Sequence, residues 1–151
     1  MMRRATLASP FGPLTLVEDG DRIVALHWRR EDAGEGSALL DEALRQMQAY
    51  FERRLTAFDL ALDWGTGLQA QVRRAMAAIP FGETRTYGDI AKTVGTPAQA
   101  VGKACGANPI PILIPCHRVL GRNTLGGFSA PGGIETKVAL LRHEGAAGLL
   151  I

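Results

Sequence analysis

The sequence predicts an α+β protein in two parts, and three observations lead to that prediction. Short β-prone runs flank an acidic turn near the start of the chain, a pattern that is typical of a hairpin. Apolar residues recur at helical spacing through most of the rest. Gly65-Thr66-Gly67 separates the two patterns. We therefore expect a small α/β unit over residues 1–62 and a mainly helical unit over residues 66–151, a division that suits 151 residues.

The first predicted element is a hairpin. Residues 14–17 and 22–28 are rich in Leu, Val and Ile, which favour strands. They flank Glu18-Asp19-Gly20-Asp21, and an acidic residue beside glycine between two such runs is a strong hairpin signal. The pattern therefore predicts two antiparallel strands at these residues.

A loop, a helix and a further extended segment follow the hairpin. Residues 31–37 are rich in glycine and acidic side chains, a composition that indicates a loop. From Ser37 to Phe51 apolar side chains recur every three or four residues, which predicts a helix. Residues 55–65 alternate loosely between apolar and polar side chains and could add a strand.

The second unit begins with two predicted helices. Residues 67–79 place their apolar side chains on one side, and the helix ends at Pro80 because proline cannot continue it. Thr86 can cap a short helix that runs through Val94. Gly95 suits the C-terminal end of that helix, where a left-handed backbone is common.

A third helix follows after a short turn. Thr96 is expected to cap a helix over residues 97–106, with Pro97 at its first position. Helix, three-residue turn and helix form the layout of a helix-turn-helix. The second of these helices carries small side chains that would let it approach a DNA groove or pack closely against other helices: Ala98, Ala100 and Gly102. Both interpretations are open from spacing alone.

The last predicted elements are a loop and a helix. Residues 121–133 are rich in glycine and contain Pro131, so we expect a long loop. Loops of this length inside a compact domain are often binding loops or lids. Residues 134–143 return to helical spacing and end before Gly145.

Charge and composition limit the kinds of partner. Residues 1–65 carry 8 basic and 11 acidic side chains, whereas residues 66–151 carry 9 and 4. The basic second half suits an acidic polymer such as nucleic acid, or simply an ordinary dipolar surface. No apolar run reaches membrane-spanning length, and the first residues lack the apolar core of a secretion signal, so we expect a cytoplasmic protein.

The segment Pro111–Val119 carries the strongest chemical signal. An apolar run ends at Pro115, and Cys116, His117 and Arg118 follow at once. Cys116 is either an inert buried thiol or a nucleophile, and nucleophilic use would require a base such as His117, acting through a bridging water, with a carboxylate such as Glu144 to orient it. A metal site is disfavoured because the chain has no Cys-x-x-Cys pair.

Several segments together resemble the O6-alkylguanine-DNA alkyltransferase family. Asn108–Val119 is similar to the family signature, and Ile79–Ala91 is similar to its first helix-turn-helix segment. Gly132–Gly145 resembles its C-terminal helix, and Ser9–Leu14 resembles the opening strand of its ribonuclease-H-like domain. The resemblance implies a ribonuclease-H-like domain followed by a winged-helix-like domain that contains the helix-turn-helix.

The resemblance also implies a reaction and its residues. Members bind double-stranded DNA, flip an O6-alkylguanine out of the stack and transfer the alkyl group irreversibly to a cysteine. Cys116 would be the acceptor, His117 its water-mediated base and Glu144 the group that orients His117. Asn108 would hold the turn that presents the cysteine, and Tyr87 would donate a proton to guanine. The positions implied to contact DNA or the flipped base are Thr86, Ala98, Gln99, Ala100, Gly102, Arg118, Val119, Phe128 and Ser129.

The sequence departs from the family pattern at Gln99, where members carry an arginine that fills the gap left by the flipped base. Glutamine is shorter and uncharged, so two alternatives stay open: a lesion-binding sensor, or an alkyltransferase for a non-standard substrate such as a free base. Cysteine at position 116, not tryptophan, separates the chain from alkyltransferase-like proteins that leave the lesion intact. The zinc cysteines of some members are absent, so no metal is implied. We also expect a monomer without a cofactor.

Overall fold

The computed structural model describes residues 2–146, and they form the mixed α+β architecture predicted from the sequence. The chain divides into two compact units, the first ending at Asp63 and the second beginning at Trp64. Among residues 2–146, no helix has the length and apolar composition needed to cross a membrane.

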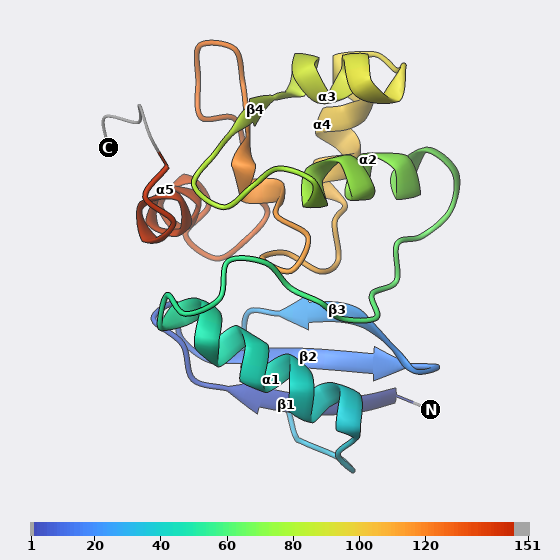
Figure 1. Ribbon diagram of the computed structural model, residues 1–151, viewed down its shortest axis with the longest axis vertical. Coiled ribbons are helices and arrows are strands. Elements are labelled where there is room, and N and C mark those ends of the chain that lie inside the picture. The colour runs from blue at the N-terminus through green and yellow to red at the C-terminus, as the bar shows by residue number, and fades with distance from the viewer. Residues whose placement is uncertain (1, 147–151) are drawn as a thin grey trace. The chain divides into compact units, whose positions relative to one another are not determined.

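The first unit contains an antiparallel sheet in the order β1-β2-β3 (Figure 1). Its strands are β1 (Met2–Leu7), β2 (Leu14–Asp19) and β3 (Arg22–His27). Asp19 pairs with Arg22, so the connection contains two residues, Gly20 with φ 59° and Asp21 with φ 65°. Positive φ at both positions matches the twist of a two-residue hairpin, and the predicted hairpin is confirmed.

The opening strand lies earlier than the sequence suggested. Ser9–Leu14 was expected to be a strand, but only Leu14 belongs to one. The segment is a tight turn in which the backbones of Ser9 and Gly12 hydrogen-bond to each other, and Gly12 has φ 88°. Pro10 and Pro13 lack the N–H group that a ladder needs. The strand that opens the sheet is β1, and it was missed because Arg3 and Arg4 interrupt its apolar pattern.

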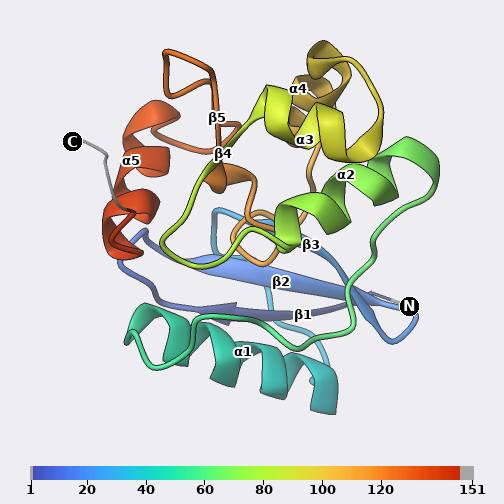
Figure 2. The same ribbon diagram turned by 45° about the horizontal axis from the view of Figure 1, so that its top comes forward.

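The helix α1 (Ala38–Phe51) crosses one face of the sheet (Figures 1 and 2). The predicted helix is present, and Ser37 caps it by accepting a hydrogen bond from the Leu40 N–H, while the Ser37 hydroxyl donates to the Glu18 carboxylate. Residues 55–65 form no strand. Their backbone meets the sheet in an isolated parallel bridge, in which Leu62 lies beside Ile23 of β3.

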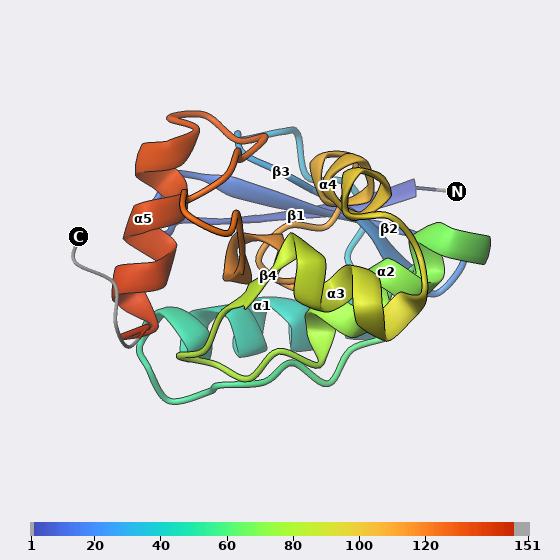
Figure 3. The same ribbon diagram turned by 90° about the horizontal axis from the view of Figure 1, so that it is seen from above.

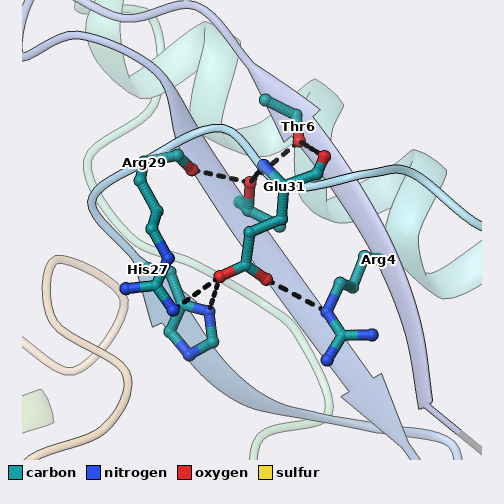
Figure 4. A network of polar contacts seen from close by, with 6 residues as sticks. Arg4, Thr6, His27, Arg29 and Glu31 are labelled. Carbon is teal, nitrogen blue, oxygen red and sulfur yellow. Dashed lines mark hydrogen bonds and ion pairs between the residues drawn. The ribbon is translucent and has the colours of Figure 1, made fainter.

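A network of polar contacts holds the segment after β3 against the sheet (Figure 4). The Glu31 carboxylate accepts hydrogen bonds from Arg4 Nε at 3.0 Å and pairs with His27 Nδ1 at 2.6 Å and with an Arg29 guanidinium nitrogen at 2.8 Å. The Thr15 hydroxyl donates to the Arg29 carbonyl at 2.7 Å and accepts from the Glu31 N–H at 3.1 Å. Side chains from all three strands thus fix the position of a loop that has no regular secondary structure.

The second unit is mainly helical, as predicted. Its elements are α2 (Gly67–Ala77), β4 (Arg85–Thr86), α3 (Tyr87–Val94), α4 (Ala98–Gly106), the 3₁₀ helix η1 (Cys116–Arg118), β5 (Val119–Leu120) and α5 (Ile134–His143). The parallel ladder between β4 and β5 joins segments far apart in the sequence (Figure 2). Strands of two residues are too short to leave a sequence pattern, so this ladder was not predicted.

The helix-turn-helix formed by α3 and α4 is confirmed (Figure 3). The Thr86 hydroxyl accepts from the Asp89 N–H, the Asp89 carboxylate accepts from the Thr86 N–H, and Gly95 ends α3 with φ 79°. The prediction that Thr96 caps α4 is wrong. Pro97 is the N-cap, because its backbone is extended (φ −64°, ψ 148°), and α4 begins one residue later than expected.

Candidate active site

Cys116 is presented by two very tight turns. The Cys116 N–H donates to the Ile114 carbonyl at 2.8 Å around Pro115, whose φ of −80° and ψ of 68° are those of an inverse γ-turn. The Leu113 N–H likewise donates to the Pro111 carbonyl at 2.9 Å, around Ile112 with φ 72°. Positive φ is rare for a β-branched residue, so Ile112 is a strained point. The apolar run therefore folds back on itself just before the thiol.

Asn108 ties the two ends of this segment together. Its Nδ2 donates to the Ile114 carbonyl at 2.8 Å, and its Oδ1 accepts from the Ile110 N–H at 3.1 Å. The Ile114 carbonyl thus accepts from both Asn108 and Cys116. The side chain predicted to hold the presenting turn lies where it can do so.

The Cys116 thiol is buried, and burial raises its pKa. A hydrogen bond from the Asn108 side chain and the positive charge of Lys137 oppose that rise without reversing it. The resting thiol is therefore protonated at neutral pH, while the nucleophile is the thiolate. Reaction at this sulfur requires a base that takes the proton when the substrate arrives.

His117, the residue that follows Cys116, forms a buried pair with Glu144. His117 Nε2 lies 2.8 Å from Glu144 Oε2, and both side chains are fully buried. Burial lowers the pKa of His117, although the carboxylate of Glu144 opposes this, so the imidazole is neutral. Burial would raise the pKa of Glu144, but hydrogen bonds from His117 and Arg118 outweigh it and lower the pKa to about 2.

The ionised carboxylate determines which nitrogen of His117 carries the proton. A carboxylate only accepts hydrogen bonds, so the proton of neutral His117 belongs on Nε2. Nδ1 then keeps its lone pair, and this atom is buried without a hydrogen-bond partner among residues 2–146. The imidazole can therefore accept a proton at Nδ1.

Arg118 lies inside the same cluster, which corrects its assignment as a DNA ligand. Its Nε and one terminal nitrogen donate to Glu144 at 2.7 and 2.9 Å, and the other terminal nitrogen donates to the Ile79 carbonyl at 2.6 Å. Only 5% of the residue is exposed. A guanidinium with these bonds balances a buried carboxylate and is not available to phosphate or base.

Tyr87, at the start of α3, lies against the glycine loop. A Cβ atom at Gly126, where φ is 73°, would lie 2.6 Å from the Tyr87 hydroxyl oxygen, so only glycine allows this approach. Burial and the two cysteines raise the pKa of Tyr87. The phenol therefore stays protonated and can donate a proton.

A pocket of about 160 Å³ opens beside the cysteine. It is bounded by α4, by the Cys116 segment and by the loop before α5, and its lining residues are Gly102, Cys105, Gly106, Cys116, Gly127, Phe128 and Ser129. Three of the residues expected to contact the flipped base, Gly102, Phe128 and Ser129, are thus brought together with Cys116. Burial raises the pKa of Cys105 to about 12, so this second thiol of the pocket is also protonated at neutral pH.

The other expected contact residues lie elsewhere. Thr86 and Ala98 line a second, larger cavity of about 670 Å³ with Tyr87, Lys92 and Arg122, on the side of α3 and α4. Gln99 is exposed, and Ala100 faces α2. Val119 is buried, and its carbonyl accepts a hydrogen bond from Lys137 at 2.6 Å.

Lys137 is the residue of this site that the sequence reasoning missed. It is completely buried on α5, and its Nζ lies within hydrogen-bond distance of two backbone carbonyls of the site. Its spacing offered a signal, because Lys137 precedes Leu141 by four residues and Glu144 by seven and so lies on their face of the helix. Within residues 2–146, no three Cys, His, Asp or Glu side chains gather as a metal site.

Comparison with known proteins covers both units. Residues 2–64 match the family model described as 6-O-methylguanine DNA methyltransferase, ribonuclease-like domain, and residues 67–146 match the model of its DNA binding domain. The methylated-DNA–protein-cysteine methyltransferases of Mycobacterium bovis and Methanosarcina acetivorans are 44% and 40% identical, over 95% and 96% of this chain and 93% and 99% of theirs.

Solved structures agree with the sequence comparison. The O6-methylguanine methyltransferase of Mycobacterium tuberculosis superimposes with a TM-score of 0.83 at 40% identity, covering 100% of this chain and 97% of that one. A structure of the same organism's protein in complex with DNA gives a TM-score of 0.81 at 44% identity, covering 93% and 91%.

Proposed function

The chain belongs to the 6-O-methylguanine DNA methyltransferase family, and from this premise we propose how its residues carry out the family's reaction. The chain is a methylated-DNA–protein-cysteine methyltransferase, which repairs DNA by direct reversal. The family resemblance drawn from the sequence is confirmed. The alternatives of a lesion sensor and of a non-standard substrate are not favoured, because the relatives are named as methyltransferases.

Cys116 is the alkyl acceptor in this proposal, and His117 is its base. With O6-alkylguanine in the pocket, the proton of the thiol passes through a water molecule to His117 Nδ1. The thiolate attacks the first carbon of the alkyl group, so a carbon–sulfur bond forms as the carbon–oxygen bond breaks. The electron pair moves onto the guanine ring, and Tyr87 supplies the proton that neutralises it. The thioether is stable, so each molecule reacts once.

The observation that carries the proposal is the orientation of His117. Glu144 accepts from Nε2, and the buried Nδ1 on the other side of the ring has no partner among residues 2–146. A neutral imidazole held in this tautomer is a base with its lone pair free. Because burial keeps the Cys116 thiol protonated, the site needs such a base.

In this proposal, DNA binds to the helix-turn-helix. A guanine inside the duplex is stacked, so the O6 chemistry requires that the base be flipped into the pocket. Small residues of α4, among them Gly102, leave the backbone close to that pocket. We place Gln99 in the gap left by the base, and the backbones of Val119 and Ser129 at the edge of the flipped guanine.

The substrate in this proposal is double-stranded DNA that carries O6-alkylguanine, and the protein acts as a monomer. We assign residues 1–62 to the ribonuclease-H-like domain and residues 66–151 to the DNA-binding and acceptor domain; residues 1 and 147–151 of these ranges lie outside the described residues. Two free cysteines suit the reducing cytoplasm.

The test is intact-mass analysis after incubation with an O6-methylguanine duplex. We expect one methyl group per chain, mapped by peptide analysis to the peptide that contains Cys116. The Cys105→Ser variant, a matched change of the second thiol in the same pocket, should still carry the adduct, and Cys116→Ser should not. A methyl group on Cys105, or no adduct on the unmodified chain, would refute the proposal.

A further inference from the structure

Lys137 is a buried charge that the reaction above does not use. The residue is 0% exposed, although other side chains of the same helix, α5, are exposed to solvent. Removing an ammonium group from water costs several kcal/mol unless it is paired. Among residues 2–146, no carboxylate forms an ion pair with it. Such a costly arrangement points to a function of the charge itself.

The hydrogen bonds of Lys137 join two walls of the site. Its Nζ donates to the Val119 carbonyl at 2.6 Å and to the Gly127 carbonyl at 3.2 Å. Val119 follows directly on η1, which begins with Cys116, and Gly127 lines the pocket on the opposite side. One side chain from α5 therefore links the acceptor segment to the glycine loop.

The groups that interact electrostatically with the ammonium are mostly neutral in the resting protein. From η1 these are the Cys116 thiol and the His117 imidazole, and from α4 the Cys105 thiol. From α3 the Tyr87 ring centroid lies 5.9 Å from Nζ. The nearby Arg118 guanidinium is paired with Glu144. The negative charge that forms at this place during the reaction is the Cys116 thiolate.

We propose that Lys137 is a positioning residue for alkyl transfer: its ammonium group holds the two walls of the pocket together and faces the Cys116 thiolate as its counter-charge. The inference rests on the proposed function of Cys116 and adds to it. In this arrangement the proton leaves the thiol for His117, and the resulting negative sulfur lies in the field of an ammonium already in place. Preorganised charge of this kind stabilises developing charge most strongly where water is excluded.

The ionisation of Lys137 gives the proposal a measurable pH dependence. Burial lowers the pKa of Lys137 to about 8, while the two cysteines oppose this. At neutral pH the side chain is still mainly charged, and it loses its charge as the pH rises through that value. Thiolate formation at Cys116 should therefore lose its counter-charge in the same range, and its rise with pH should flatten there.

The experiment compares the full-length chain with Lys137→Met, which keeps the length of the side chain but removes the charge, and with Lys137→Arg, which keeps the charge. Alkylation of Cys116 by iodoacetamide is measured without DNA from pH 6 to pH 10, about two pH units on either side of 8, with peptide mapping to separate Cys116 from Cys105. Single-turnover methyl transfer from an O6-methylguanine duplex is measured over the same range. Arg142→Met, an exposed cation on the same helix, is the control.

We expect Lys137→Met to shift the Cys116 profile to higher pH and to slow both reactions at neutral pH by about tenfold or more, one pKa unit being a factor of ten. Lys137→Arg should restore much of the profile, and Arg142→Met should leave it unchanged. A purely structural role would lower the rates at every pH without shifting the profile. That outcome, or an unshifted Lys137→Met, would overturn the proposal.

Two further readouts keep the test decisive. If Lys137→Met does not fold by circular dichroism, the profile of the unmodified chain decides alone: it must flatten near pH 8, and a simple titration through pH 10 refutes the inference. The iodoacetamide reaction does not depend on DNA. A chain that transfers no methyl group would refute the proposed function, while its thiol profile would still report on Lys137.

Discussion

At the scale of single residues, Glu144 is the group on which the buried site depends. Its two oxygens accept from His117 and from two nitrogens of Arg118, and it is 4% exposed. Without it, the imidazole would lose the partner that orients it and the guanidinium would become an unbalanced buried charge. Removing one partner of a buried ion pair typically costs about 3–5 kcal/mol.

The first prediction concerns acid stability. Because the pKa of Glu144 is lowered from 4.5 to about 2, its ionised form stabilises the native state above pH 4.5, and this contribution is lost as the pH falls towards 2. The loss amounts to about 3 kcal/mol at most. Urea denaturation at a series of pH values should show it in the unmodified chain.

Glu144→Gln is the matched variant for this measurement. It should be less stable at neutral pH and should lose less free energy of unfolding between pH 4.5 and 2, because the ionisable group is gone. Its methyl transfer should also be slower, since an amide can present either its oxygen or its NH2 group to His117 Nε2 and so does not fix the tautomer as a carboxylate does. Curves for the two proteins that run parallel through this range would contradict the assignment.

At the scale of elements, α4 carries the residue that we propose fills the gap left by the flipped base. Gln99 is exposed near the start of this helix, outside the pocket beside Cys116. An arginine at this position would be longer and charged, and its planar donors would reach a phosphate or the orphaned cytosine more readily.

We therefore expect Gln99→Arg to raise the single-turnover rate on an O6-methylguanine duplex more than the rate on free O6-benzylguanine, which needs no flipping. The two rates are measured by quenched-flow labelling of Cys116. Gln99→Lys, which adds charge without the planar fork, serves as the control for simple electrostatics. Equal effects of Gln99→Arg on both substrates would remove flipping as the explanation.

The loop after β3 allows a second prediction at this scale. Its position depends on the contacts of Glu31 with Arg4, His27 and Arg29 (Figure 4). Glu31→Gln removes the charge that gathers them, so we expect faster tryptic cleavage after Arg29, followed on a gel and by mass spectrometry. Glu35→Gln, an exposed change in the same loop, should cleave at the rate of the unmodified chain. Equal rates for Glu31→Gln would show that the carboxylate does not fix the loop.

At the scale of the whole molecule, charge is unevenly distributed. Residues 66–151 carry 9 basic and 4 acidic side chains, and two of the cations, Lys92 and Arg122, line the cavity on the side of the helix-turn-helix. Contacts of such cations with phosphate release counterions, which makes DNA binding weaken as salt rises.

We expect the logarithm of the binding constant to fall linearly with the logarithm of the salt concentration. Lys92→Ala and Arg122→Ala should each flatten that slope by about 0.9, the value for one phosphate contact. Fluorescence anisotropy with a labelled duplex measures it. Arg22→Ala, in the hairpin of the other unit, should leave the slope unchanged. An unchanged slope in the first two variants would place the DNA elsewhere.

The sequence by itself determined the elements whose signals are local. The hairpin at Gly20-Asp21, the cap at Thr86 and the ends of α5 depend on residues within one or two turns of each other, and all lie where the pattern predicted. The motif around Cys116 identified the family for the same reason, because it is continuous in the chain. Its conformation was less accessible, since the two γ-turns leave no periodic pattern.

Only the tertiary structure decided which polar groups are buried together. Arg118 read as a DNA ligand from its place in the motif, yet its partners Glu144 and Ile79 lie 26 and 39 residues away. Lys137 was not singled out from the sequence, yet its ammonium group bonds carbonyls 18 and 10 residues away. A charged side chain is recognisable from the sequence, but whether it is solvated or paired depends on the free energy of burying it beside groups that only folding brings close.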